Sequence, residues 1–175
     1  MTRTRCERAS PSIVVTRMKI AVAPIEAWRR LLFFEDVVDP PPLPLRILLP
    51  SPIRTEGCKT KLGDEARCLY TSGYLRKRVT RIDEGRLYGF EIIEQALDVG
   101  RGIRLLGGGY ELRGLPGGAT VVALETRYES PRRPGWIWGP IETAVCHLFH
   151  RHLLAAIRRQ TSVERTATDT AGTSR

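Results

Sequence analysis

The stretch that decides the fold lies near the end of the chain, where residues 134–160 read PGWIWGPIETAVCHLFHRHLLAAIRRQ. Apolar side chains recur in it every three or four residues, which is the spacing of one face of an α-helix. Pro134 and Gly135 open the stretch, and proline is tolerated in a first helical turn. We therefore expect a long helix that ends near Gln160 and packs through a broad face formed by Ile137, Trp138, Ile141, Ala144, Val145, Leu148, Phe149, Ala155 and Ala156.

Short segments with the composition of β-strands fill most of the chain before this helix, and turns that contain glycine separate several of them. This order is typical of an antiparallel meander, in which consecutive strands pair with each other. The segments that we expect to form strands are residues 12–21, 54–59, 65–72, 74–83, 86–95, 103–113 and 119–130.

Three features interrupt the meander. Residues 24–34 (PIEAWRRLLFF) have helical spacing, which predicts a short helix after the first strand. Residues 39–52 combine many prolines with apolar residues, which predicts a stiff loop folded onto the domain, either as a flap or as a simple cover of the core. Gly107, Gly108 and Gly109 lie inside a strand pattern, which indicates a bulge or sharp bend that lets a sheet curl.

This order of elements resembles the helix-grip fold of the START/Bet v 1-like superfamily, also called SRPBCC. Several phrases are similar to those of the superfamily: residues 22–28 (VAPIEAW), 72–83 (SGYLRKRVTRID), 110–112 (YEL), 117–120 (GGAT) and 126–128 (TRY). The resemblance covers residues 12–160, which we treat as a single domain, and we expect residues 1–11 and 161–175 to be disordered.

The resemblance implies an α+β fold in which a curved antiparallel sheet of about seven strands wraps around a long C-terminal helix. A short helix and the Pro-rich loop follow the first strand, and an apolar cavity lies between sheet and helix. Members of the superfamily bind lipids, polyketides, sterols or plant hormones, and some are cyclases or aromatase-like enzymes. Others carry a Rieske iron centre on an added domain, but the cysteine and histidine pattern of that domain is absent here.

The composition narrows the class of protein. The 175 residues are 42% hydrophobic, which is enough for a packed core, but no run approaches the roughly 18–20 apolar residues that span a bilayer. The basic N-terminus is not followed by the apolar stretch of a secretory signal, so we expect a cytoplasmic protein. The net charge of +9 can favour nucleic acid or anionic membranes, but the basic residues are scattered, so a nucleic-acid partner is not expected.

The four cysteines are Cys6, Cys58, Cys68 and Cys146, and none of them forms a C-x-x-C pair. We therefore expect neither a zinc site nor any other metal or cofactor. Cys58 and Cys68 flank the turn at Gly63, so they either face each other across a hairpin or are separate reduced thiols.

The predicted ligand site is the cavity between sheet and helix. Such a site needs apolar walls with a few polar groups. Candidates on the sheet are Tyr88, Phe90, Ile92, Tyr110 and Leu112, and candidates on the helix are Trp138, Ile141, Val145, Leu148 and His152. Each of these side chains could instead simply pack in the core.

The histidines His147, His150 and His152 lie close together in the sequence. On a helical wheel His147 and His150 fall on the polar side, whereas His152 falls near the centre of the apolar face. They therefore cannot converge on one metal ion. We expect His152 to point into the cavity, either as a satisfied core histidine or as a ligand-binding or acid–base group.

Three functions are compatible with the sequence. The first is a carrier or sensor that binds a hydrophobic small molecule or lipid, as a monomer or homodimer. The second is an enzyme of the polyketide cyclase/dehydrase kind that uses His152, Tyr110 or Tyr88 as acid or base. The third is an interaction protein that binds RNA or membranes through a basic surface.

Overall fold

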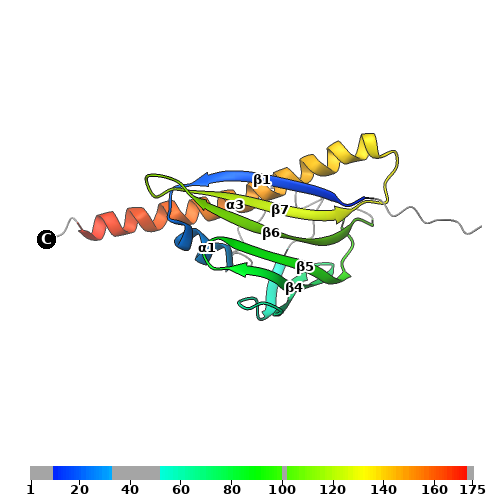
Figure 1. Cartoon of the computed structure of the whole chain (residues 1–175), viewed down its shortest axis with the longest axis horizontal. Coiled ribbons are helices and arrows are strands. Elements are labelled where there is room, and N and C mark those ends of the chain that lie inside the picture. Colours follow the sequence, from blue (N-terminus) through cyan, green and yellow to red (C-terminus); the bar gives the residue numbers. More distant parts are fainter. Residues whose placement is uncertain (1–9, 33–51, 100–101, 173–175) are drawn as a thin grey trace, which may run out of the picture.

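A single curved antiparallel sheet and one long helix make up most of the structure, which is a computed structural model (Figure 1). It describes residues 10–32, 52–99 and 102–172. In chain order the elements are β1 (Ser12–Ile20), α1 (Pro24–Leu32), β2 (Pro52–Gly57), β3 (Glu65–Tyr70), β4 (Gly73–Asp83), β5 (Leu87–Ala96), β6 (Arg104–Gly114), β7 (Thr120–Glu129) and α3 (Gly135–Gly172).

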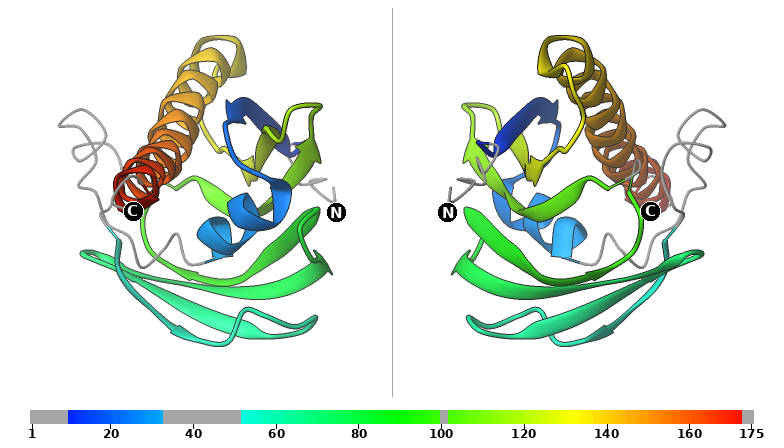
Figure 2. Two further views of the ribbon diagram at one scale, coloured as in Figure 1. Left: turned by 90° about the vertical axis from the view of Figure 1, so that its left-hand side faces the viewer. Right: turned by 90° about the vertical axis from the view of Figure 1, so that its right-hand side faces the viewer.

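The seven strands follow the order β1-β7-β6-β5-β4-β3-β2, so the first strand closes the meander by pairing with the last. That pairing runs without a break from Ser12 opposite Tyr128 to Ile20 opposite Thr120. Figure 2 shows the sheet curving from β1, which lies beside α3, round to β2, β3 and β4, with α1 inside the curve. The predicted helix-grip architecture is therefore confirmed.

The triple glycine lets three strands approach closely. A Cβ atom on Gly108 would lie 2.3 Å from the carbonyl oxygen of Glu125 on β7, and one on Gly109 would lie 2.2 Å from that of Tyr88 on β5. The register between β6 and β7 also shifts between Leu105 and Gly107, as expected of a bulge. The predicted irregularity in this strand is confirmed.

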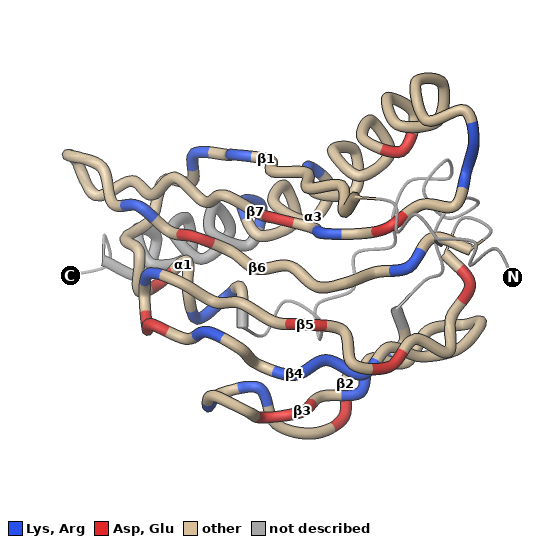
Figure 3. Tube along the Cα trace, turned by 45° about the vertical axis from the view of Figure 1, so that its right-hand side comes forward, with Lys and Arg blue, Asp and Glu red and all other residues tan. Residues whose placement is uncertain are grey.

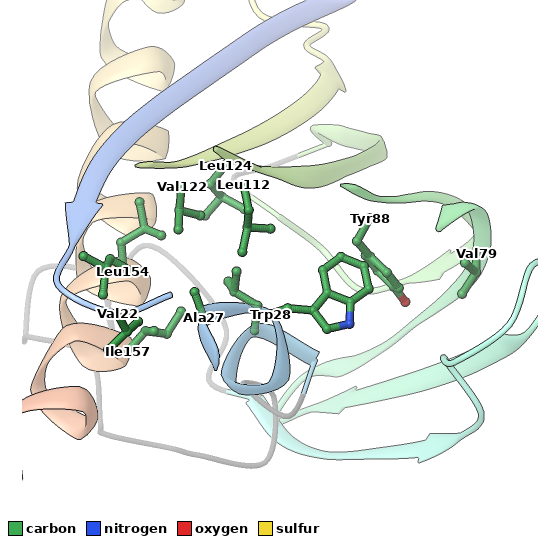
Figure 4. Packing of buried hydrophobic residues seen from close by; sticks show 12 residues of the cluster. Val22, Ala27, Trp28, Val79, Tyr88, Leu112, Val122, Leu124, Leu154 and Ile157 are labelled. Atoms are coloured by element: carbon green, nitrogen blue, oxygen red, sulfur yellow. The ribbon is translucent and has the colours of Figure 1, made fainter. Parts of the chain in front are cut away.

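The main hydrophobic core fills the part of the concave side where α1 and the middle of α3 meet the sheet (Figure 4). Trp28 on α1 and Leu154 on α3 are both buried there. The cluster contains Ile20, Val22, Ala27, Trp28, Leu31, Val79, Tyr88, Leu112, Val122, Leu124, Leu154 and Ile157. A smaller cluster of Leu75, Leu97 and Val99 lies apart from it.

The long helix differs from the prediction in length. It extends to Gly172, although we expected it to end near Gln160 and the residues beyond to be disordered. The sequence between these two residues contains neither proline nor glycine, so nothing in it breaks the helix before Gly172. Apolar periodicity shows where a helix packs, but not how far its backbone continues.

The face of α3 that packs differs in part from the predicted one, although Ala156 is buried as expected. Ile141 is 47% exposed and Leu148 44% exposed, and Ile137 is also exposed. The buried residues of α3 include Glu142 and His150, because the sheet side offers hydroxyl groups to them. The Ser130 hydroxyl donates to Glu142 Oε1 over 2.6 Å, for example.

Two other expectations bear on the segments around β2. The Pro-rich loop of residues 39–52 lies outside the described residues except for Pro52, and so does Cys6. Cys58 and Cys68 do not face each other, because Thr55 lies opposite Cys68 in the sheet and both thiols are free.

Candidate functional site

A pocket lies on the concave side of the sheet, beside the main core. We call it the concave pocket; its lining residues are Lys59, Ala66, Lys77, Val79, Tyr88, Phe90 and Tyr110. The whole depression measures about 300 Å³, including the part that is open to solvent. The space in it that the centre of a water molecule can occupy is only about 10 Å³, barely the room that one water molecule needs. The described side chains therefore leave room for about one water molecule, and a larger ligand would need them to move apart.

The strand register explains why these residues meet. Val79 on β4 lies opposite Phe90 on β5, and Tyr88 on β5 lies opposite Tyr110 on β6. Side chains alternate between the two faces of a strand, so Lys77 and Val79 share the concave face of β4. Lys77 itself lies opposite Ala66 on β3, which brings that strand into the same site.

Aromatic rings form one wall of the concave pocket. The rings of Tyr88 and Tyr110 are stacked, with centroids 5.2 Å apart and an interplanar angle of 12°. The ring centroid of Tyr88 also lies 6.3 Å from that of Phe90. It lies 6.1 Å from that of Trp28, and these two rings meet edge-on (Figure 4). Such contacts restrain the rings through specific geometry as well as buried area. This wall is continuous with the core and is therefore held in place.

Two lysines add positive charge to the concave pocket. The Lys77 ammonium lies 4.8 Å from the centroid of the Phe90 ring, a cation–π contact. Lys59 follows β2, and its Nζ atom is buried. Sequence reasoning missed both residues, although the alternation of β4 could have placed Lys77 on the same face as Val79.

The sheet candidates from the sequence lie in or near this site. Tyr88, Phe90 and Tyr110 line the concave pocket. Leu112 is buried in the main core, and Ile92 packs against the smaller cluster.

The helix candidates do not line the concave pocket. Ile141 and Leu148 are exposed, whereas Val145 and His152 are half-buried. The guanidinium carbon of Arg132 lies over the Trp138 ring, 4.7 Å from the centroid of that ring. Their contact with a ligand remains a prediction.

A group of polar side chains joins α3 to β1 and β7. We call it the polar seam, and it consists of Thr16, Thr126, Cys146, His147 and His150. The Thr16 hydroxyl lies 2.7 Å from His147 Nδ1 and 2.9 Å from His150 Nδ1, and Thr126 Oγ1 lies 2.8 Å from His150 Nε2. The expectation that His147 and His150 lie on the outer, polar side of the helix is therefore wrong.

The protonation states in the polar seam follow from burial. His150 is 1% exposed, and this burial, with a smaller effect of His147, lowers the pKa of His150 to about 4. Burial likewise raises the pKa of the Cys146 thiol to about 11. At neutral pH a neutral imidazole therefore lies beside a protonated thiol, which is a poor nucleophile. Among the described residues, no three or more His, Cys, Asp or Glu side chains are placed to hold a metal ion.

Charged side chains on the outer face of the sheet are mixed in sign. Figure 3 shows lysines and arginines interspersed with acidic residues along the strands. Arg78 pairs with Glu65 at 2.8 Å and with Glu91 at 3.4 Å, and Arg76 pairs with Glu94 at 3.4 Å. The described part of the chain contains no helix that is both long and apolar enough to cross a membrane.

Comparison with known proteins supports the fold and leaves the function open. No protein-family model matches the chain, and no curated protein matches it. A solved structure from Thermus thermophilus is 15% identical with a TM-score of 0.59, and covers 87% of this chain and 99% of its own. Ara h 8.0201 is 11% identical with a TM-score of 0.54, over 86% of this chain and 97% of its own.

A third similar structure is the Aha1 dimer from Colwellia psychrerythraea, at 11% identity and a TM-score of 0.51, over 84% of this chain and 93% of its own. At such low identities the likeness shows a shared fold alone. The chain has the Bet v 1-like helix-grip fold, as the resemblance of its sequence predicted.

Proposed function

We propose that this chain binds a small hydrophobic molecule in the concave pocket and acts as its carrier or sensor. The observation that carries the proposal is the aromatic wall of Tyr88, Phe90 and Tyr110 at a depression on the concave side of the sheet. Ligand sites are typically concave and mostly apolar, with a few polar groups that orient the ligand.

The fold supports this proposal, because the main core fills only part of the concave side of the sheet. The side chains of the concave pocket cover another part of that side. The main core occupies the side near α1, and Tyr88 belongs to both the core and the concave pocket. A ligand bound to the aromatic wall would thus contact side chains that the main core already holds in place. Because the free space holds only about one water molecule, binding requires the lining side chains to move apart around a compact ligand.

The proposal is tested with the neutral fluorescent probe N-phenyl-1-naphthylamine, whose emission rises in an apolar site. We expect saturable binding to the full chain, and much weaker binding to Phe90→Ala, which removes part of the wall. The matched control is Trp136→Ala, because Trp136 is an exposed aromatic residue at the start of α3. Absence of saturable binding, or equal loss in both variants, would contradict the proposal. As a separate measurement, mass spectrometry of the purified chain under native conditions identifies any co-purified ligand.

A cyclase-like enzyme is the alternative that a specific observation favours. Tyr88 and Tyr110 place phenol groups on side chains that line the concave pocket, and a phenol can act as a general acid. His152 does not line the concave pocket, so the histidine that the sequence suggested as acid or base is not available there. If Tyr110→Phe leaves probe binding intact but abolishes conversion of a polyketide-like substrate, the enzymatic alternative gains over the carrier.

A further inference from the structure

The first half of α3 is polar toward the sheet and apolar toward solvent. Glu142 and His150 are buried, and both meet hydroxyl groups of the sheet side. The exposed residues between Gly135 and His150 are instead apolar: Trp136, Ile137, Pro140, Ile141, Ala144 and Leu148. A surface helix of a globular protein normally has the reverse arrangement. A contiguous exposed apolar patch of this kind marks an interaction surface, whereas single exposed apolar residues are ordinary.

Four of these residues form a continuous stripe along the helix. Ile137, Ile141, Ala144 and Leu148 follow each other at intervals of four, three and four residues, so they share one side of α3. We call this set the outer stripe; at 1.5 Å per residue it is about 16 Å long. Trp136, beside its start, is 78% exposed. Figure 2 shows this half of α3, in yellow and orange, with one side turned away from the sheet.

The exposed charges near the outer stripe are all positive. Arg133 precedes the helix and Arg151 follows the stripe, and both are exposed. Arg158 and Arg159 are exposed further along the same helix. Among the described side chains of α3, which end at Arg159, the acidic one is Glu142, and it is buried. An apolar stripe with basic ends matches a partner that is apolar inside and anionic at its boundary.

A second copy of the chain matches the outer stripe less well. If two stripes paired in antiparallel directions about their midpoints, Arg151 of one copy would approach Arg133 of the other. Parallel pairing would place the two copies of Arg151 side by side. Either arrangement brings like charges together, which is costly at an interface. A second copy therefore satisfies the apolar residues of the stripe but not its basic ends.

An anionic lipid surface satisfies both parts. Basic residues near such a surface are attracted to its negative potential. Apolar residues along one side of a helix enter the boundary between headgroups and acyl chains. Tryptophan prefers the same boundary, because its ring is apolar and its N–H can reach a polar partner.

We propose that the outer stripe of α3 docks this protein on membranes that contain anionic phospholipids. The first half of α3 lies parallel to the membrane surface, with Ile137, Ile141 and Leu148 below the headgroups. Arg133 and Arg151 lie beside lipid phosphates. This docking is peripheral, and it does not depend on a ligand in the concave pocket, whose lining includes no residue of α3.

The test is flotation of the full chain with vesicles of phosphatidylcholine alone and with vesicles of phosphatidylcholine and phosphatidylglycerol in a three-to-one mixture. Each basic residue near the surface contributes about fivefold, so the mixed vesicles should bind at least about tenfold more strongly. Leu148→Glu and Ile141→Glu place a charge in the outer stripe, and each should weaken binding to mixed vesicles at least about tenfold. The matched control is Leu62→Glu, which makes the same charge change at a residue that is 67% exposed in the turn between β2 and β3. It should change binding by less than about twofold, because screening limits the reach of a single charge.

Two further measurements separate the contributions of charge and apolar contact. Arg151→Gln should weaken binding to mixed vesicles about fivefold. Arg54→Gln, on the edge strand β2 at the opposite end of the sheet from β1, should change it by less than about twofold. In the unmodified chain, tryptophan emission should shift to shorter wavelength when mixed vesicles are added, because Trp136 leaves water. This last measurement requires no variant to fold.

Four outcomes would overturn the proposal. Equal loss of binding in Leu148→Glu and Leu62→Glu would mean that scattered charge, and not the outer stripe, holds the protein on the vesicles. Equal binding to the two kinds of vesicle would remove the role of anionic lipid, and unshifted tryptophan emission would remove the contact at Trp136. A dimer in analytical ultracentrifugation that Leu148→Glu dissociates, without vesicle binding by the unmodified chain, would assign the outer stripe to a second copy.

Discussion

Acidification should destabilise this protein through His150, one of the most deeply buried side chains of the polar seam. In the folded chain, burial between Thr16 and Thr126 holds the pKa of His150 at about 4. In the unfolded chain the imidazole returns to its ordinary pKa of about 6.5. Between these values the unfolded chain binds a proton that the folded chain does not, so stability falls as pH falls.

The two pKa values set the size of the effect. The contribution of His150 to stability is fully present above pH 6.5 and is lost as the pH approaches 4. A shift of this size corresponds to at most roughly 3 kcal/mol at full loss. By the same relation, the free energy of unfolding should fall by roughly 2 kcal/mol between pH 7 and pH 5. That window lies above the range in which most carboxylates titrate, so their protonation contributes little to the change.

Urea unfolding at several pH values measures this dependence in the unmodified chain and in His150→Gln. The variant loses hydrogen bonds, which lowers its stability at every pH, but it lacks the titrating imidazole, so its decline between pH 7 and pH 5 should be much smaller. The control His152→Gln removes a half-buried histidine that lies two residues further along α3, and it should keep the steep decline. Equal slopes for the unmodified chain and His150→Gln would refute the reasoning, as would a direct NMR titration that gives His150 a pKa near 6.5.

Three further changes test the packing. Leu154→Ala should lower the free energy of unfolding by about 2–5 kcal/mol, because Leu154 is fully buried in the main core, whereas Leu148→Ala should cost well under half as much; equal losses by urea unfolding would place the packed face of α3 elsewhere. Gly108→Ala should cost about 1–3 kcal/mol or more, because its new Cβ meets the Glu125 carbonyl, whereas Gly135→Ala has open space and should be nearly neutral by thermal unfolding. Thr16→Val should cost about 1–3 kcal/mol by removing the hydroxyl that contacts both His147 and His150, and an unchanged midpoint in urea would show that water replaces it.

The sheet could be predicted from the sequence almost strand by strand. Its strands are bounded by turns in which glycine adopts backbone angles that other residues disfavour, as at Gly63 and Gly85. Such turns are local, so a single sequence reveals them. The triple glycine of β6 was also informative, because a run of glycines inside a strand has few purposes other than close backbone approach.

The packed face of α3 could not be predicted in the same way. A helical wheel ranks faces by hydrophobicity, and on that measure His150 and Glu142 belong outside. Both are buried because hydroxyl groups of β1, β7 and the residue after β7 meet them: Thr16, Thr126 and Ser130. The partner of each polar group lies more than ten residues away in the chain, so only the assembled fold reveals that burial is compensated.

The same limitation affected the candidate site, because the sequence suggested a cavity walled equally by sheet and helix. In the structure α3 makes its largest strand contact with β1, at the edge of the sheet, and the concave pocket is lined by sheet residues and by Lys59. Helix orientation and the lining of the concave pocket thus depend on different residues. Directional hydrogen bonds in the polar seam orient the helix, and the aromatic wall and lysines form the pocket. Substitutions in the seam should therefore change stability and its pH dependence much more than ligand affinity.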